Sequence, residues 1–321
     1  MRFIDRILKP STRAFVREAR KTPGFSFFDF LHGYVYSRWP YLYIGISTGR
    51  HPAAPWFALL AGWFNRLTAR TRKAQTSTAE ISYADTYHGK AVPLATAEQL
   101  VHIHQDIDVP DLEQVIPYKR ARSIILRNPD HIVVLDCPCR LSREHPCLPL
   151  DVCLIVGEPF ASFAHEHHPH RSRQITSDEA VAILQAEDQR GHVHHAFFKD
   201  AMLGRFYAIC NCCKCCCGAM QAQRNGNPML ASSGYVSVVD AALCLGCGDC
   251  NPYCQFEALS LTDDLNRVDY DKCMGCGVCV DKCEHGALSL VRDPAKGVPL
   301  EVCSLMSEAI HLEASDLASR A

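Results

Sequence analysis

The chain has 321 residues and a formal net charge of −2, and 48% of its residues are apolar, which is enough to build ordinary folded cores. Its 19 cysteines exceed what incidental thiols would give, and a chain of this length does not need the disulfides that hold small secreted domains together. We therefore expect the reducing cytoplasm of an anaerobe and no secretory signal. No apolar run reaches the roughly 20 residues that a membrane-spanning helix needs.

Charge is distributed unevenly along the chain. Residues 1–73 contain 13 Lys and Arg against three Asp and Glu, so this part carries +10 and the remaining residues together carry −12. Such asymmetry predicts a basic docking surface on an acidic body. No nucleic-acid recognition motif accompanies the basic residues, so we expect no nucleic-acid partner.

The N-terminal elements are basic and aromatic. Residues 2–21 predict an amphipathic helix that Pro10 interrupts, and residues 25–64 contain many aromatic side chains, including all three tryptophans. Cations combined with amphipathic rings are typical of a peripheral membrane anchor. The same pattern also fits a helical hairpin that packs on the rest of the protein or on a partner subunit. Residues 1–75 are therefore expected to form a helical docking segment. The sequence does not decide whether it docks on a membrane, on the rest of the protein or on a partner subunit.

A polar linker around residues 68–82 leads into a middle domain, expected at residues 76–232. Short apolar runs predict four buried strands, at 131–137, 151–157, 192–198 and 205–210. Residues 111–127 predict a helix, and another is expected after Thr176, where Glu179 completes a capping box. The alternation of strands and helices predicts an α/β domain within a chain of α+β class. No glycine-rich nucleotide or phosphate loop follows a strand, which argues against a nucleotide-dependent reaction. We also do not expect a small-molecule substrate.

Ten cysteines of the middle domain gather where its strands end. The first group has enough thiols for one cubane cluster and consists of Cys137, Cys139, Cys147 and Cys153. The second group places six thiols within eight residues, at Cys210, Cys212, Cys213, Cys215, Cys216 and Cys217. Side chains alternate along an extended strand, so Cys210 and Cys212 share a face that Cys213 does not, and two sites are expected. These cysteines could bind one or two further iron–sulfur clusters or structural zinc, or could carry out redox thiol chemistry, and the sequence does not decide among these alternatives.

Two histidine groups lie between these cysteine groups. Residues 165–170 fit a solvated loop, and residues 192–195 fit an ordinary strand. Histidine titrates near neutral pH, so His194 and His195 are also candidates for proton-coupled electron transfer. Cys303 stands alone near the C-terminus and is expected to be buried without a function.

One cysteine phrase occurs twice, 29 residues apart. Each copy has the spacing C-x2-C-x2-C-x3-C and continues into Ala-Leu-Ser-Leu, at 258–261 and at 287–290. The copies consist of Cys244, Cys247, Cys250 and Cys254, and of Cys273, Cys276, Cys279 and Cys283. This is the ligand spacing of [4Fe–4S] clusters, whereas zinc sites usually pair two C-x2-C units across a longer gap. Glycines between the ligands permit sharp turns that bring N–H groups close to sulfur.

On these motifs, residues 235–291 resemble the bacterial two-[4Fe–4S] ferredoxin domain, with domain bounds expected at 233–293 and a C-terminal helical tail at 294–321. The resemblance implies two clusters with interlocked ligand sets, because the fourth cysteine of each copy binds the other cluster. The implied sets are Cys244, Cys247, Cys250 and Cys283 for one cluster, and Cys273, Cys276, Cys279 and Cys254 for the other. Proline often follows the fourth cysteine in that family, and here Gln255 and Glu284 stand in its place.

The upstream cysteine strings carry resemblances of their own. Cys215-Cys216-Cys217-Gly218 resembles the CCG motif of heterodisulfide-reductase-type subunits, which hold noncubane clusters. A Cys-Pro-Cys-Arg string at 137–140 and a Cys-Asn-Cys-Cys string at 210–213 precede the ferredoxin-like part. This combination is similar to that of uncharacterised iron–sulfur proteins of anaerobic bacteria.

Together these features predict an iron–sulfur electron-transfer protein or electron-transfer subunit rather than an enzyme. It would relay single electrons between a soluble redox partner and a membrane-associated or multi-subunit redox complex. We expect it in the cytoplasm or peripherally on the inner face of the cytoplasmic membrane. The alternatives are a ferredoxin-fed reductase with its active site at Cys210–Cys217, and a zinc-stabilised interaction module fused to a ferredoxin.

Overall fold

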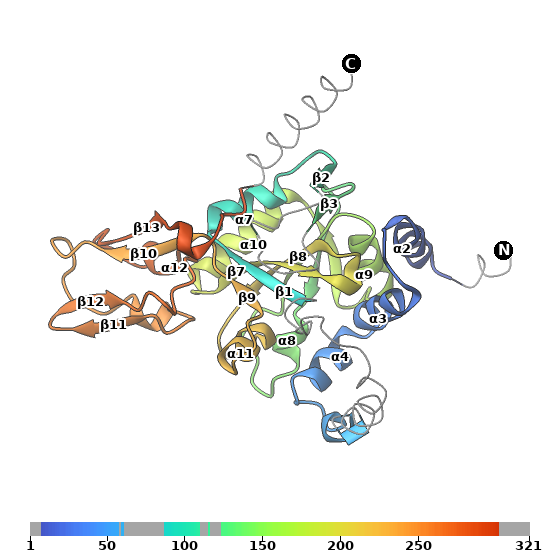
Figure 1. Cartoon of the computed structure of the whole chain (residues 1–321), viewed down its shortest axis with the longest axis horizontal. Coiled ribbons are helices and arrows are strands. Elements are labelled where there is room, and N and C mark those ends of the chain that lie inside the picture. The colour runs from blue at the N-terminus through green and yellow to red at the C-terminus, as the bar shows by residue number, and fades with distance from the viewer. Residues whose placement is uncertain (1–7, 58, 61–86, 110–114, 116–122, 302–321) are drawn as a thin grey trace, which may run out of the picture.

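The computed structural model describes residues 8–57, 59–60, 87–109, 115 and 123–301 (Figure 1). The linker expected at 68–82, most of the helix expected at 111–127, and Cys303 lie outside the described residues. Within the described part, the chain combines helices with sheet, and its ferredoxin-like part lies near the C-terminus. None of the described helices is both long and apolar enough to cross a bilayer.

The middle domain is built on one seven-stranded sheet with the order β6-β4-β5-β8-β7-β1-β9. Its strands are β1 (Tyr87–Val92), β4 (Ile132–Asp136), β5 (Asp151–Val156), β6 (Ser172–Ile175), β7 (Val193–Lys199), β8 (Arg205–Cys212) and β9 (Leu230–Ala231). Every neighbouring pair is antiparallel except β1 with β9. Antiparallel neighbours such as β7 and β8 need only a short connection and no helical crossover. The expected α/β middle domain is therefore corrected to a mainly antiparallel α+β domain.

The four predicted strands are present as β4, β5, β7 and β8, each within two residues of its expected bounds. Thr176 caps helix α10 (Ser177–Gln189), and its hydroxyl accepts a hydrogen bond from the Glu179 amide at 3.2 Å. The prediction of a helix at 111–127 is wrong for the last residues of that range. There Ile124–Leu126 forms β3, which pairs with β2 (Ile107–Val109), because β-branched side chains favour a pleated, half-buried surface.

Alternate residues along the strands face two different cores. Ile132 and Val134 of β4 face the first core, which α7 (Leu94–Val101) and α10 cover. Val133 and Leu135 face the second core, which α2 (Pro10–Lys21) and α9 (Phe160–His167) cover. A strand buried on both faces gives a continuous apolar run in the sequence, as these strands do. Six of the ten upstream cysteines also belong to the second core or pack against it.

The N-terminal helices α2, α3 (Phe27–Arg38) and α4 (Pro40–Ser47) pack on the second core, on the side of the molecule away from the ferredoxin-like part (Figure 1). Pro10 is the first residue of α2, a position where proline's missing N–H costs nothing. Phe15 of α2 is buried against the rings of Phe160 and Phe163. This is the packing expected of a helical hairpin.

The ferredoxin-like part extends from one side of the middle domain (Figure 1). It contains two small antiparallel sheets and the short helices α12 (Val278–Asp281) and η2 (Asn251–Tyr253). One sheet pairs β10 (Tyr235–Val239) with β13 (Leu288–Arg292), and the other pairs β11 (Leu259–Thr262) with β12 (Leu265–Val268). Each repeated Ala-Leu-Ser-Leu thus continues as a strand after its cysteine phrase. Other short helices among the described residues include α8 (Pro138–Leu141), α11 (Gly218–Arg224), η1 (Asp200–Met202) and η3 (Pro294–Lys296).

Candidate metal centres

Two cavities in the ferredoxin-like part are each lined by four cysteines. One is lined by Cys254, Cys273, Cys276 and Cys279, and the other by Cys244, Cys247, Cys250 and Cys283. In each cavity three thiols come from one cysteine phrase and the fourth comes from the other phrase. Each phrase therefore serves both cavities, which is the interlocked geometry of two-cluster ferredoxins.

N–H groups point at the sulfurs in this part of the chain. The alanine that opens each Ala-Leu-Ser-Leu repeat donates its amide hydrogen to the fourth cysteine of the phrase, at 3.2 Å for Cys254 and 3.3 Å for Cys283. Asn266 Nδ2 donates to Cys250 Sγ at 2.7 Å. Donors of this kind stabilise the negative charge of a thiolate that ligates iron. The residues present therefore fit iron–sulfur clusters.

Two glycines between the cysteines occupy positions that no other residue can fill. Gly246 and Gly275, at equivalent places in the two phrases, have φ values of 66° and 63°. A Cβ atom would lie 2.2 Å from the Asp264 oxygen at the first position and 2.1 Å from the Tyr235 oxygen at the second. The chain can turn tightly around each cavity only because these side chains are absent.

Residues 267–289, which contain the whole second cysteine phrase, match the family model described as a 4Fe-4S binding domain. This part of the chain is a ferredoxin-like iron–sulfur domain. Neither the curated proteins nor the solved structures gave a match to the chain.

The iron–sulfur domain contacts the middle domain through residues next to Cys254. Gln255 Oε1 accepts from the Lys214 amide at 2.8 Å, and its Nε2 donates to the Gly191 carbonyl at 2.7 Å. Lys214 Nζ lies 3.1 Å from the Glu257 carboxylate. Gln255 stands where proline often follows the fourth cysteine in the ferredoxin family. A proline could make neither of the Gln255 side-chain hydrogen bonds, so this departure from the family pattern supplies two of the inter-domain contacts.

The ten upstream thiols form two groups that differ from the groups expected from sequence. We call the first group the thiol cavity; its sulfurs line a cavity of about 100 Å³ and belong to Cys137, Cys139, Cys153, Cys210, Cys212 and Cys217. The second group, which we call the four-thiol cluster, consists of Cys147, Cys213, Cys215 and Cys216. Cys213 and Cys216 also reach the wall of the cavity. Cys147 thus lies apart from the three cysteines with which it was grouped, and the six-cysteine string divides between the two groups.

Strand register explains why the thiol cavity forms. Cys153, Cys210 and His195 are direct neighbours across β5, β8 and β7. Directly paired residues project from the same face of a sheet, and so does Cys212, two residues beyond Cys210. Cys212 Sγ lies 3.3 Å from Cys217 Sγ, which follows the turn after β8. The face shared by Cys210 and Cys212 is the one expected from strand alternation.

The N-terminal helices cover the thiol cavity. Tyr36 of α3 and Ile44 of α4 line it together with Tyr207 and Phe160 of the middle domain. The Tyr36 and Tyr207 hydroxyls are 2.8 Å apart, and burial raises the pKa of Tyr36. The cavity is therefore lined mainly by sulfur, aromatic rings and aliphatic side chains, and the docking segment is part of its wall.

His195 lies between the thiol cavity and the iron–sulfur domain. Its side chain is fully buried and contacts Cys212, and among the described residues neither ring nitrogen has a nitrogen or oxygen partner. On the other side of His195 lies Phe256 of the iron–sulfur domain, with 6.3 Å between ring centroids. Phe256 is two residues from Cys254. Contacts therefore run without interruption from the iron–sulfur domain to the thiol cavity.

Three cationic side chains surround the thiol cavity. The Arg50 guanidinium lies 3.5 Å from the Cys139 carbonyl oxygen, and Arg140 forms part of the wall. Lys199 Nζ lies 4.5 Å from the centre of the Tyr87 ring, and burial lowers the pKa of this lysine to about 8. Thiolates in a water-poor site require such counter-charges. Sequence reasoning did not identify these cations, because three separate segments bring them together.

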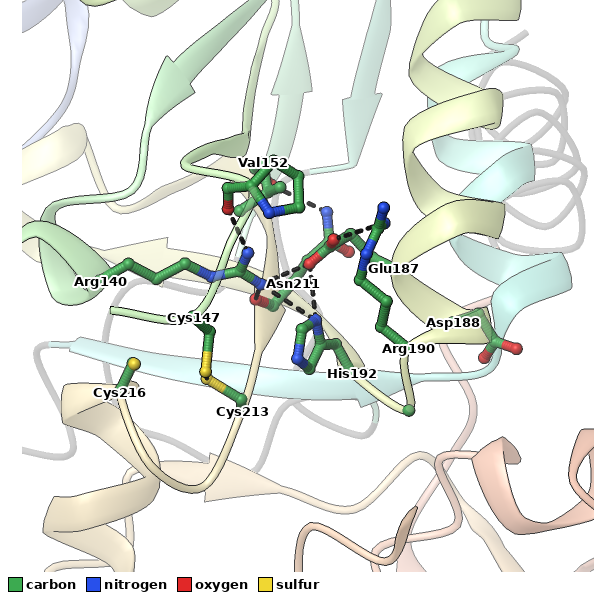
Figure 2. Close-up of polar contacts among 12 residues, drawn as sticks. Arg140, Cys147, Val152, Glu187, Asp188, Arg190, His192, Asn211, Cys213 and Cys216 are labelled. Atoms are coloured by element: carbon green, nitrogen blue, oxygen red, sulfur yellow. Dashed lines mark hydrogen bonds and ion pairs between the residues drawn. The ribbon is translucent and has the colours of Figure 1, made fainter. Parts of the chain in front are cut away.

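Arg140 is one of the largest fully buried side chains among the described residues, and it pairs with Glu187 of α10 (Figure 2). Its guanidinium also donates to the Asn211 carbonyl at 3.2 Å and lies 3.1 Å from His192 Nδ1. Burial raises the pKa of Glu187, but the contacts with His192 and Arg140 outweigh burial and the pKa is lowered overall. The only sequence signal for this network was the place of Arg140 in the Cys-Pro-Cys-Arg string.

Proposed function

We propose that the protein transfers single electrons between an external redox partner and a further iron–sulfur cluster in its middle domain. The observation that carries this proposal is the row of contacts from Cys254 through Phe256 and His195 to Cys212. A carrier that used only its ferredoxin-like part would need no such contact with a second thiol site. We therefore treat the middle domain as the other end of an internal relay.

The iron–sulfur domain would hold two [4Fe–4S] clusters. Their ligands would be Cys244, Cys247, Cys250 and Cys283 for one cluster and Cys273, Cys276, Cys279 and Cys254 for the other. The four cysteines of each set line one cavity, and N–H donors point at the sulfurs of both sets. Iron–sulfur clusters supply one-electron chemistry at potentials that such donors and the local polarity tune.

The thiol cavity would hold the third cluster. Its six sulfurs exceed the four that a cubane uses, so the ligand set is complete without any thiol of the four-thiol cluster. The surrounding rings limit access of water, and Arg50 and Lys199 offset negative charge. His195, buried against Cys212, is placed to hold a proton that accompanies an electron.

The N-terminal helices would provide the contact with the external partner at a membrane surface. The outer side of these helices and of the helical residues just after them leaves large apolar side chains exposed, at Phe27, Phe28, Leu31, Trp39, Leu42, Trp56, Phe57, Leu59 and Leu60. Exposed basic residues of α2, such as Arg17, Arg20 and Lys21, lie on the adjoining helix. Rings and cations together suit an interface with anionic lipid. Helices α3 and α4 also wall the thiol cavity, which would bring the third cluster close to that partner.

Rapid anaerobic reduction, followed by freeze-quenched paramagnetic resonance, tests the relay. In the wild type, we expect the signals of the iron–sulfur domain to appear first and a third signal to follow. Phe256→Ala should slow the third signal several-fold and leave the first two unchanged. Tyr270→Ala, at an exposed aromatic position of the same domain, is the matched control and should behave as wild type. An unchanged third signal in Phe256→Ala would contradict the proposed path.

A further inference from the structure

The four-thiol cluster brings all four of its sulfurs together in one compact group. The sulfurs of Cys147, Cys213, Cys215 and Cys216 all lie within 4.8 Å of one another. Among the described residues, this is the one group of three or more metal-ligating side chains that meets this limit. The eight cysteines of the iron–sulfur domain do not meet it, although the same structure arranges them around two cavities.

The sulfur–sulfur distances are nearer to those around a single metal ion than to those around a cubane. Cys147 Sγ lies 3.0 Å from Cys215 Sγ and 3.6 Å from Cys213 Sγ. Cys215 Sγ lies 3.3 Å from Cys213 Sγ and 3.7 Å from Cys216 Sγ. Four thiolates at about 2.3 Å from one zinc ion stand about 3.8 Å apart at the corners of a tetrahedron. In a cubane each thiolate binds a different iron and points outward, so the sulfurs stand farther apart.

Two separate segments bring these thiols together. Cys147 belongs to the loop between α8 and β5, and the other three belong to the turn between β8 and α11. Figure 2 shows Cys147, Cys213 and Cys216 close together on one side of the buried Arg140 pair. The Arg140 guanidinium donates to the Pro149 carbonyl, which anchors the first loop near Cys147. Arg50 donates to the Cys216 carbonyl at 3.1 Å and to Ser142 Oγ at 2.9 Å, which links the second segment to the first.

We propose that Cys147, Cys213, Cys215 and Cys216 bind one zinc ion with tetrahedral geometry. Four thiolates complete the coordination of zinc and leave no open position, so the ion is structural rather than catalytic. The ion joins two segments. One is the loop after the Cys-Pro-Cys-Arg string, and the other is the turn at the end of the Cys-Asn-Cys-Cys string. Both strings also supply the thiol cavity, so the ion fixes the positions of the cavity's ligands.

The ion also holds the surface on which the iron–sulfur domain rests. Lys214 lies between two of the ligands, Cys213 and Cys215. Its amide donates to Gln255, and its ammonium group pairs with Glu257. Loss of the ion would free this turn, and the iron–sulfur domain would lose its alignment with the thiol cavity.

The test measures zinc, iron and sulfide per chain in the full-length protein purified without oxygen. The wild type should contain one zinc, and Cys147→Ser and Cys216→Ser should each lose it while keeping the eight irons of the iron–sulfur domain. Cys303→Ser is the thiol-for-hydroxyl control and should keep the zinc. Retention of zinc in both ligand variants, or one sulfide-free iron in place of zinc, would contradict the proposal.

X-ray absorption at the zinc edge of the wild type decides the question even where the variants do not fold. The expected result is a single shell of four sulfurs at about 2.3 Å. A shell that contains nitrogen or oxygen, or a wild-type protein without zinc, would overturn the assignment. Neither result would bear on the clusters of the iron–sulfur domain, so the two proposals can fail separately.

Discussion

Arg140 and Glu187 form an ion pair in the interior of the middle domain, and only 1% of each side chain is exposed. A buried charge is tolerated when its partner and its remaining hydrogen bonds are present, and Glu187 meets this requirement through Arg140, Arg190 and His192. The main effect of this network is to hold residues in position. It fixes the residue next to Cys139 relative to helix α10 and therefore fixes one wall of the thiol cavity.

Glu187→Gln is expected to lower the free energy of unfolding by about 3 kcal/mol, because it leaves the Arg140 charge buried without its counter-ion. Urea unfolding under argon, followed by circular dichroism, measures the change. Glu179→Gln is the matched control, because its pair with Arg173 is exposed by 43% and 48% and should contribute less than about 1 kcal/mol. Equal losses in the two variants would show that burial does not set the energy of the pair.

Asp188, the neighbour of Glu187, should make the free energy of unfolding depend on pH. Burial, and then the nearby Asp281 carboxylate, raise the pKa of Asp188 to about 6. The folded state therefore binds a proton more tightly than the unfolded state, and stability falls as pH rises from about 4 to about 6. Asp188→Asn removes the buried charge and should raise the free energy of unfolding at pH 7 by roughly 2 kcal/mol.

The same variant should show little of the decline between pH 4 and pH 6. Unfolding curves at pH 4 and pH 7 for wild type and Asp188→Asn measure both effects. His194 Nε2 lies 3.8 Å from the Asp188 carboxylate, and burial lowers the pKa of His194 to about 4, so the histidine loses its proton at the acidic end of this window and is neutral near pH 6. A wild type that gains stability between pH 4 and pH 7 relative to the variant would refute the sign of this prediction.

A short segment after the first cysteine phrase supplies side-chain hydrogen bonds between the two domains. Gln255 and Glu284 hold equivalent positions in the two phrases, but only Gln255 bonds to the middle domain, and Glu284 is exposed. This difference provides an internal comparison. Substitution at either position leaves the adjacent cysteine ligand unchanged.

Gln255→Ala should remove two inter-domain hydrogen bonds, each with a net value of about 1 kcal/mol, and should loosen the contact without loss of iron. Hydrogen exchange of the amides near Gly191 and Lys214 should accelerate about tenfold or more. Glu284→Ala should leave this exchange unchanged. Protection that survives in Gln255→Ala would mean that other contacts hold the domains together.

The outer sides of α3, α4 and the helical residues 54–57 that follow expose more large apolar side chains than a solvated surface requires. Phe28 is 78% exposed and Trp56 is 71% exposed. Phe28→Ser combined with Trp56→Ser should weaken binding to anionic lipid vesicles by at least about tenfold, since each ring contributes more than 1 kcal/mol when buried. Vesicle co-sedimentation measures this, and Leu261→Ser, at an exposed apolar position of the iron–sulfur domain, is the control. Vesicle binding that is absent in the wild type or equal in all three proteins would refute membrane contact.

Across the molecule, features encoded locally could be predicted from sequence and features produced by tertiary packing could not. The cysteine spacing of the iron–sulfur domain is local, and the four strands of the middle domain follow from apolar runs that bury both faces. Strand direction is not local, and the antiparallel order of the sheet was missed. The apolar run at Ile124–Leu126 was assigned to a helix because a short run has no clear period.

The candidate sites show the same division. Alternation along β8 correctly placed Cys210 and Cys212 on one face. Cys147 joins Cys213, Cys215 and Cys216 because of the path of the loop between α8 and β5. No sequence pattern predicts that path. Gln255 was noticed as a departure from the ferredoxin pattern, but its role depends on a carbonyl more than 60 residues away.

The relay depends most directly on whether the thiol cavity contains iron. The deciding measurement is iron and acid-labile sulfide per chain, in the anaerobically purified wild type and in a variant with both Cys137→Ser and Cys153→Ser. We predict about 12 of each in the wild type and about eight in the variant, because only the third cluster uses these two thiols. Eight irons in both proteins would contradict the account, since the middle domain would then hold no iron–sulfur cluster.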